Sequence, residues 1–342
     1  MEGITQVTDK DLIKIGHIAK TFDFNFKLTR LYASYLENAP DIITAEMMSA
    51  LTEDGDISPE CAFCALLCEI FGIDADRSPD DRRMIREYIT PSIRRLDPKN
   101  YEENPYYKNI VIPEVTDGSW ELKRESYKPY RGVIAHDMIM KEDYREIPPL
   151  GFFEREFSFP AVLEDSNEWM TLTPVDLDTC EEAIERAEGR VVTFGLGLGY
   201  YAYMVSQKDN VESITVVERS AQVIKLFEKY ILPQFPNKDK VHIVNSDAFE
   251  YAERVMPDER FDLAFVDTWR DASDGAPMYR KMKALEGLSP NTHFMYWIEN
   301  FLVSRIRAER FVSLMTEIEL GSPAAPSCYE EFLSLLDDPL RS

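Results

Sequence analysis

Apolar residues near the start of the chain recur every three or four positions. Residues 12–18 and 28–36 show this spacing, which places apolar side chains on one face of a helix. Ser58 and Ser78 are each followed by proline, the residue favoured at the first helical position after a capping serine. We therefore expect a helical subdomain over residues 1–97, with roughly four or five helices. Its sequence indicates no chemistry.

A linker and short extended segments follow. Residues 97–109 are rich in proline, asparagine and tyrosine, which is typical of a domain boundary, and Asp117-Gly118 indicates a tight turn. We expect residues 98–174 to form a linker and a small β-rich section. Its candidate strands are residues 110–112, 120–123, 132–135, 157–159 and 169–172.

Strand and helix patterns alternate in the next part of the chain. Five apolar runs, the first of them rich in β-branched residues, predict strands at residues 191–194, 214–217, 241–244, 261–266 and 292–298. A helical pattern covers residues 178–187 before the first strand, and others cover residues 221–232, 248–256 and 277–288 between the later strands. This alternation predicts an α/β fold, a doubly wound parallel sheet with right-handed crossovers, over residues 175–300. Residues 301–342 predict a C-terminal extension of a helix, a linker and a second helix.

Three glycines follow the first strand of this sheet. Gly195, Gly197 and Gly199 stand at alternate positions before a segment that suits a helix. Glycine takes positive φ and lets a ligand approach the backbone, while the helix start presents free N–H groups. The dinucleotide-binding pattern G-x-G-x-x-G requires glycine where this chain has Tyr200. The turn therefore favours a nucleotide-like ligand other than NAD.

Acidic residues end three successive strands. These residues are Glu218, Asp247 and Asp267. Ligands of open parallel sheets bind outside the carboxyl ends of the strands, so the three carboxylates are expected to converge on the glycine turn. The alternative is that each carboxylate only caps the helix that follows it.

The glycine turn and the acidic strand ends resemble class I S-adenosylmethionine-dependent methyltransferases over residues 190–300, a Rossmann-like family. The resemblance implies S-adenosylmethionine as the cofactor, Glu218 as the ribose acceptor, Asp247 with the Ala248 amide as the adenine contact, and Asp267 as the residue facing the sulfonium and the substrate. Asp267 is also the candidate catalytic base or orienting carboxylate. The cofactor-binding residues implied in this way are Phe194, Gly195, Leu196, Gly197, Gly199, Glu218, Arg219, Asp247, Ala248 and Asp267.

The family also implies candidates for the substrate side. Trp169, Met170 and Thr173 precede the first strand and are expected at the mouth of the site, while Tyr200, Tyr201 and Trp269 are candidate aromatic walls near a cation. All of these residues could equally belong to the hydrophobic core. Many members end in a sixth and a reversed seventh strand, which residues 301–342 do not predict. The substrate side is therefore expected to differ from the family pattern.

Three alternatives remain open at this point. The segment around Asp267 with Glu299-Asn300 resembles small-molecule O-methyltransferases that bind Mg²⁺, although those enzymes usually carry aspartate where Glu299 stands; we assign no metal. Polyamine aminopropyltransferases share the β-rich section and the acidic character, but their Gly-Gly-Gly-Asp-Gly loop contains an aspartate that is missing here. A non-catalytic S-adenosylmethionine-binding protein is the third reading. A preference for decarboxylated S-adenosylmethionine would indicate aminopropyl transfer.

Composition narrows the choice of partners. The formal net charge of −24 disfavours nucleic acid, because the global field repels phosphates. A small-molecule acceptor, cationic or neutral, fits this charge better. No apolar run reaches the length of a membrane helix and the first residues lack the pattern of a signal peptide, so a cytoplasmic protein without a membrane partner is expected. The N-terminal helices could cover a substrate or form the interface of a homodimer.

Cysteines form one local cluster. Cys61, Cys64 and Cys68 are spaced so that a helix would place all three on one face. Zinc and iron–sulfur sites normally need a fourth ligand, and the sequence offers no His or Cys nearby. Five cysteines in a chain of 342 residues fit reduced thiols better than a disulfide framework. We expect the three to pack as small hydrophobic side chains.

Overall fold

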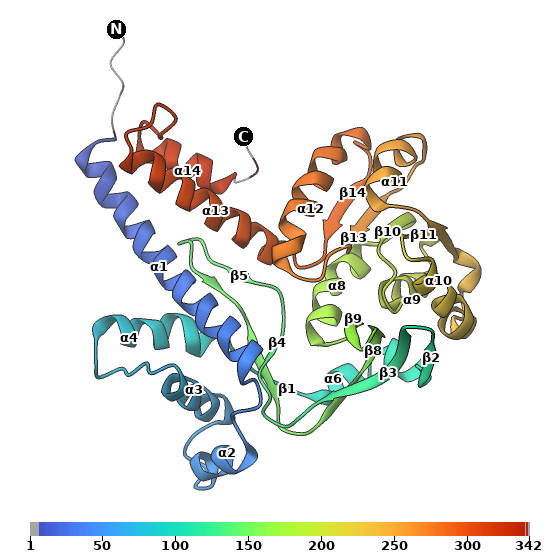
Figure 1. Ribbon diagram of the computed structural model, residues 1–342, viewed down its shortest axis with the longest axis horizontal. Coiled ribbons are helices and arrows are strands. Elements are labelled where there is room, and N and C mark those ends of the chain that lie inside the picture. The colour runs from blue at the N-terminus through green and yellow to red at the C-terminus, as the bar shows by residue number, and fades with distance from the viewer. Residues whose placement is uncertain (1–6, 339, 341–342) are drawn as a thin grey trace. The chain divides into compact units, whose positions relative to one another are not determined.

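The computed structural model describes residues 7–338 and residue 340. The chain divides into two compact units (Figure 1). The first comprises Met1–Arg94, Met138–Leu150 and Asn300–Ser342, and the second comprises Arg95–Asp137 and Gly151–Glu299.

A five-stranded parallel sheet forms the centre of the second unit, in the order β12-β11-β10-β13-β14. This Rossmann-like sheet confirms the predicted fold class. After β12 the chain crosses to the other side of β10, so the topological switch point lies beside β10. The strands are β10 (Gly189–Phe194), β11 (Val211–Glu218), β12 (Val241–Asn245), β13 (Leu263–Val266) and β14 (His293–Tyr296).

The crossover helices pack in two pairs. Helix α8 (Pro174–Arg186) contacts α9 (Tyr200–Ser206), and α11 (Ala248–Arg254) contacts α12 (Ala272–Leu285). Right-handed crossovers on either side of a switch point place such pairs on opposite faces of the sheet. Helix α10 (Ala221–Leu226) continues as a π-helical turn.

Two helix boundaries differ from the sequence prediction. Helix α12 begins at Ala272, whereas the sequence predicted a start at Pro277. Asp271 and Asp274 form a capping box at this earlier start, so Pro277 lies inside the helix. The predicted helix over residues 221–232 is α-helical only to Leu226, after which π and 3₁₀ turns follow.

The section before the parallel sheet contains a four-stranded antiparallel sheet, in the order β2-β3-β8-β9. Residues 110–112, predicted as extended, form no strand; Ile110 and Ile112 are buried in the core instead. The predicted linker contains two short helices, α6 (Pro98–Glu102) and α7 (Pro105–Asn109). The strands of the sheet are β2 (Val115–Asp117), β3 (Trp120–Tyr127), β8 (Phe157–Glu164) and β9 (Asn167–Thr171).

A second, three-stranded sheet has the order β1-β7-β4. Its strands are β1 (Ile93–Leu96), β7 (Leu150–Phe153) and β4 (Val133–Ile134). The expectation that residues 1–97 form helices alone was therefore wrong at β1. Gly151 in β7 leaves no room for a larger residue, because a Cβ there would meet the side chains of Leu96 and Ala135.

Helices dominate the first unit. Ser58 and Ser78 accept hydrogen bonds from the backbone N–H groups of Cys61 and Asp81, as their capping role predicted. The extension after the parallel sheet is helix, linker and helix, as the sequence indicated. The helices of this unit are α1 (Asp9–Asn38), α2 (Ala45–Thr52), α3 (Pro59–Ile70), α4 (Pro79–Met84), α5 (Thr90–Ser92), α13 (Glu299–Glu319) and α14 (Tyr329–Asp337).

The core of this unit joins its two terminal segments. Phe22 of α1 stacks on Phe311 of α13 with ring centroids 4.1 Å apart, and Phe332 of α14 meets Phe311 edge on. A short ribbon of β5 (Ile139–Met140) and β6 (Glu146–Ile147) carries the buried carboxylate of Glu146. Arg307 lies 3.1 Å from that carboxylate and offsets its burial. Across the residues that the structure describes, no helix has both the length and the apolar character needed to cross a bilayer.

Candidate functional site

The glycine turn is tied to both neighbouring strands. Gly195 N–H donates to the carbonyl of Val217 in β11 over 2.9 Å, and Asp267 N–H, just after β13, donates to the carbonyl of Phe194 over 2.8 Å. All three glycines have positive φ, +100° at Gly195, +51° at Gly197 and +76° at Gly199. The turn therefore lies at the switch point of the sheet with its backbone fixed on two sides.

All three glycines also face close neighbours, which for Gly199 is the ring of Phe227. A Cβ on Gly195 would overlap the backbone carbonyl of Asp267, whereas a Cβ on Gly197 would overlap the thioether of Met170. The first obstacle is backbone and cannot move aside, but the second is the end of a flexible side chain. The turn therefore passes directly under Met170, which the sequence placed at the mouth of the site.

Glu218 ends β11 beside the turn and is only 7% exposed. Its Oε2 accepts a hydrogen bond from Leu196 N–H over 3.1 Å, and its Oε1 accepts one from Ser220 N–H over 2.7 Å. These two bonds fix the plane of the carboxylate, and a carboxylate has lone pairs left for further donors. Glu218 is therefore a rigid acceptor next to the glycine turn.

Asp247 performs the capping role that the sequence left open as an alternative. Its Oδ1 accepts hydrogen bonds from Phe249 N–H and Glu250 N–H, over 2.9 and 3.1 Å, at the start of α11. It also borders the same cavity as Glu218, together with Ala248. Asp247 therefore caps α11 and borders the cavity at the same time.

Asp267 is the most strongly perturbed carboxyl group of this region. Burial is the main cause that raises its pKa to about 8, and the negative charges of Asp176 and Glu218 contribute to the same rise. Burial likewise raises the pKa of Asp176 to about 7, although hydrogen bonds from Thr173 lower it. Such elevated carboxyl pKa values next to a cavity are typical of functional sites.

One cavity of about 410 Å³ collects most of the predicted residues. A smaller one, of about 20 Å³, adjoins it around Tyr200 and Tyr201. Phe194 and Gly199 do not border the large cavity. Phe194 is fully buried and packs edge on against Tyr251, and Gly199 faces the ring of Phe227. The predicted residues that border it are Trp169, Met170, Gly195, Leu196, Gly197, Glu218, Arg219, Asp247, Ala248, Asp267 and Trp269.

The lining of this cavity is strongly acidic. Seven carboxyl groups and two guanidinium groups border it. Arg270 is one of the two and lies over the ring of Trp169, 5.2 Å from its centroid. Such a field attracts cations and disfavours anionic ligands.

Two buried polar atoms of the lining have unused hydrogen-bonding capacity. Within the described part of the chain, Thr268 Oγ1 and Trp269 Nε1 are buried without a hydrogen-bond partner. Both residues border the cavity. Buried polar groups normally have partners, so an unpaired pair here indicates a site where a ligand or water completes the bonding.

Two of the three residues of the magnesium alternative, Glu299 and Asn300, are engaged elsewhere. Glu299 accepts a hydrogen bond from Tyr279 over 2.6 Å and lies 3.5 Å from Lys283 Nζ. Asn300 donates its amide to the carbonyl of Met138. Among residues 7–338, no group of three or more His, Cys, Asp or Glu side chains is arranged to hold a metal ion.

Sequence reasoning missed Asp176 and the unpaired hydroxyl of Thr268. The sequence contained a signal for Asp176, because Thr173 followed by Asp176 three residues later matches a capping box. The structure shows both hydrogen bonds of this capping box. Thr268 carries no such signal, since only the packing around it decides whether its hydroxyl finds a partner.

No protein-family model matches this chain, and no curated protein matches it either. Solved structures match parts of it. Spermidine synthase from Thermotoga maritima is 15% identical with a TM-score of 0.30, over 46% of this chain and 60% of that chain. Precorrin 8W decarboxylase from Methanobacterium thermoautotrophicum is 17% identical with a TM-score of 0.29, over 44% of this chain and 74% of that chain.

A conserved hypothetical protein from Streptococcus pyogenes is 16% identical with a TM-score of 0.25, over 31% of this chain and 65% of that chain. The chain thus spans less than two thirds of this protein and of the spermidine synthase. At such identities and TM-scores these likenesses carry no argument about function.

Proposed function

We propose that the protein is an S-adenosylmethionine-dependent methyltransferase that acts on a small molecule. The observation that carries the proposal is the single acidic cavity at the switch point of the sheet, bordered by the glycine turn, Glu218, Asp247 and Asp267. Its volume of about 410 Å³ lies in the range of small-molecule sites. Positive charge on a sulfonium suits a cavity with this excess of carboxyl groups.

The residues present fit this cofactor. Glu218 is held by two backbone N–H groups with lone pairs to spare for the two ribose hydroxyls. Gly195 and Gly197 border the cavity with bare backbone, since a Cβ on either would overlap Asp267 or Met170. Trp269 Nε1 and Thr268 Oγ1 supply unpaired polar atoms at the same cavity.

The chemistry requires little of the protein beyond positioning. S-adenosylmethionine supplies an activated methyl group, and the chain's task is to hold an acceptor in line with it and exclude water. Asp267 is the candidate base. Its carboxyl group has a pKa of about 8 in the free protein, and once a bound sulfonium favours its ionised form it can accept a proton from an acceptor. Trp169 and Arg270 form one wall of the cavity and are candidates for acceptor contact.

Aminopropyl transfer is the second candidate. The four-stranded antiparallel sheet that precedes the parallel sheet favours it, together with an acidic lining that would suit a polyamine. The missing aspartate in the glycine turn argues against it.

Calorimetry with three ligands tests the proposal and separates the two candidates. We expect S-adenosylmethionine and its demethylated product to bind, each at one site per chain. Tighter binding of decarboxylated S-adenosylmethionine would instead indicate aminopropyl transfer. Absence of binding by all three would refute both proposals.

Glu218→Gln is expected to weaken S-adenosylmethionine binding by about tenfold or more. The amide keeps the size of the side chain but turns an N–H₂ group toward one of the two backbone donors, and hydrogen bonds to a charged group contribute about 1.5–3 kcal/mol. The control is Glu212→Gln, an exposed position of the same strand. Equal affinities of the two variants would contradict the assigned role of Glu218.

A further inference from the structure

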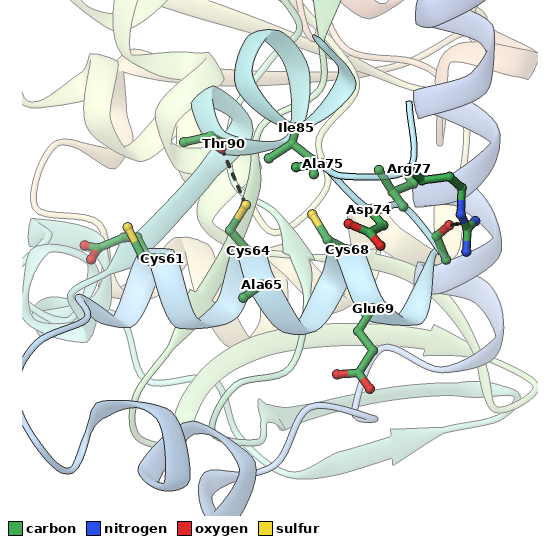
Figure 2. A pocket seen from close by; sticks show the side chains of 13 residues that line it. Cys61, Cys64, Ala65, Cys68, Glu69, Asp74, Ala75, Arg77, Ile85 and Thr90 are labelled. Carbon is green, nitrogen blue, oxygen red and sulfur yellow. Dashed lines mark hydrogen bonds between the residues drawn. The ribbon is translucent and has the colours of Figure 1, made fainter. Parts of the chain in front are cut away.

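A second cavity lies beside α3 in the first unit and has a volume of about 660 Å³. Figure 2 shows the sulfur atoms of Cys61, Cys64 and Cys68 on the same side of α3, facing the segment that carries Ile85 and Thr90. We call this cavity the α3 thiol pocket. It belongs entirely to the first unit and shares no residue with the site described above.

The thiols line this pocket, while other residues of α3 make its main packing face. Phe63 and Leu67, on α3, are fully buried and make its packing face, whereas Cys61 is exposed. Cys64 and Cys68 are largely shielded yet border the pocket. The prediction that the three cysteines share one face of a helix is confirmed, but this face lines a cavity and does not simply fill the core.

Cys64 has two hydrogen-bond partners that favour its thiolate. The Cys68 thiol lowers the pKa of Cys64 to about 7, Thr90 lowers it as well, and burial opposes both. The distance from Cys64 Sγ to Thr90 Oγ1 is 3.6 Å. Cys68 shows the opposite shift, a raised pKa, so it retains its proton beside the Cys64 sulfur.

Other ionisable groups approach from neighbouring segments. Tyr32 of α1 lies close enough to both thiols to interact with their charge, and its hydroxyl bonds to Ser92. Asp74 and Arg77 border the pocket from the loop after α3.

The charges around the pocket select against anions. Glu60, Glu69 and Asp74 are part of its lining, and Arg77 is the cation among these residues. Arg77 donates to the carbonyl of Gly72 over 2.8 Å, so its guanidinium is already used in closing the loop. Apolar side chains make up much of the remaining surface, including Ala65, Ile73 and Ile85.

We propose that the α3 thiol pocket binds a small, neutral, mainly apolar molecule that carries an α,β-unsaturated carbonyl group, and that Cys64 adds to it. The Cys64 sulfur forms a bond to the β-carbon, and the electron pair of the double bond moves toward the carbonyl. The proton that leaves Cys64 returns to the α-carbon. The product is a thioether, and no oxidant or reductant is needed.

Site-resolved labelling of the intact, native chain tests this proposal. The chain is treated with less than one equivalent of ethyl vinyl ketone at pH 7, and each cysteine is quantified by peptide mass spectrometry. We expect Cys64 to take the label before Cys61, although Cys61 is the exposed residue. At pH 7 a thiol with a pKa of about 7 has roughly 15-fold more thiolate than an ordinary thiol. Each such thiolate reacts roughly 5-fold more slowly, because nucleophilicity falls with pKa. The net labelling rate of Cys64 is therefore expected to be about 3-fold higher than that of Cys61.

A homologous series separates binding from intrinsic reactivity. Ethyl vinyl ketone has one methylene more than methyl vinyl ketone. If the pocket buries this methylene, ethyl vinyl ketone is expected to react with Cys64 up to about 4-fold faster, because that is the gain in binding from one buried methylene. The same pair should react equally with Cys328, a partly exposed cysteine outside the pocket, and with the chain unfolded in urea. A maleimide that carries a carboxylate should label Cys64 more slowly than N-ethylmaleimide.

Three variants examine the environment of Cys64. Cys68→Ala and Thr90→Val each remove one partner of its sulfur, so the pH midpoint of Cys64 labelling should rise in both, while Thr90→Ser should restore it. Thermal melting of each variant checks that it folds. Earlier labelling of Cys61 in the native wild-type chain, or equal rates with the two ketones at Cys64, would overturn the proposal.

Discussion

Replacing Gly195 by alanine is expected to lower the free energy of unfolding by about 3 kcal/mol and to abolish binding of S-adenosylmethionine. The backbone at this position has φ of +100°, a conformation whose cost for a residue with a Cβ is about 1–3 kcal/mol. The added Cβ would also overlap the backbone carbonyl of Asp267, whose own N–H group is bonded to the carbonyl of Phe194. Urea denaturation and calorimetry measure the two effects.

The matched control is Gly197→Ala in the same turn. Its φ of +51° lies in the left-handed region, where the cost for alanine is about 1–2 kcal/mol, and the Met170 side chain that a Cβ would meet can move. We expect a loss of stability smaller than that of Gly195→Ala. Equal losses in the two variants would show that the fixed carbonyl of Asp267 is not what restricts position 195.

The affinity for S-adenosylmethionine is expected to rise about tenfold per pH unit between pH 6 and 8. In the free protein burial holds the pKa of Asp267 at about 8, so the group is mostly protonated at neutral pH. A bound sulfonium favours the ionised carboxylate, so binding releases a proton and strengthens as pH rises until it levels off above pH 8. Calorimetry in buffers of different ionisation enthalpy counts the released protons.

Asp267→Asn should remove the pH dependence of S-adenosylmethionine affinity, except for the part that Asp176 contributes, because the pKa of Asp176 is about 7. The demethylated product, which lacks the positive charge, should show little pH dependence with the wild-type chain. If the affinity of Asp267→Asn depended on pH as strongly as that of the wild-type chain, the released proton would come from another group. That result would contradict the proposed role of Asp267.

The raised pKa of Asp267 should also make the free energy of unfolding depend on pH. The pKa of Asp267 is raised above its ordinary value of 3.8 to about 8, so the folded state retains a proton that the unfolded chain loses. Its burial therefore costs little below pH 4 and increasingly more as pH rises to 8. Asp267→Asn should raise the free energy of unfolding at pH 9 and leave it nearly unchanged at pH 4.

The five strands of the parallel sheet, the glycine turn and the acidic strand ends followed from local signals. Short apolar runs, glycines at alternate positions and a carboxylate at the ends of three successive strands are patterns within a few residues. The topology rules for parallel sheets then bring them to one edge. Helix α12 shows the limit of such signals. Pro277 suggested a start, but the capping box of Asp271 and Asp274 at an earlier position prevailed.

Sequence alone determined the α/β class, the position of the turn at the end of β10 and the placing of Glu218, Asp247 and Asp267 beside it. Only the tertiary structure decided that Asp176 and Asp267 share a buried, acidic environment that raises both pKa values, and that the thiols of α3 line a cavity. The reason is physical. Secondary structure depends on neighbours a few residues away, whereas desolvation and cavity shape depend on segments that meet only after the chain has folded.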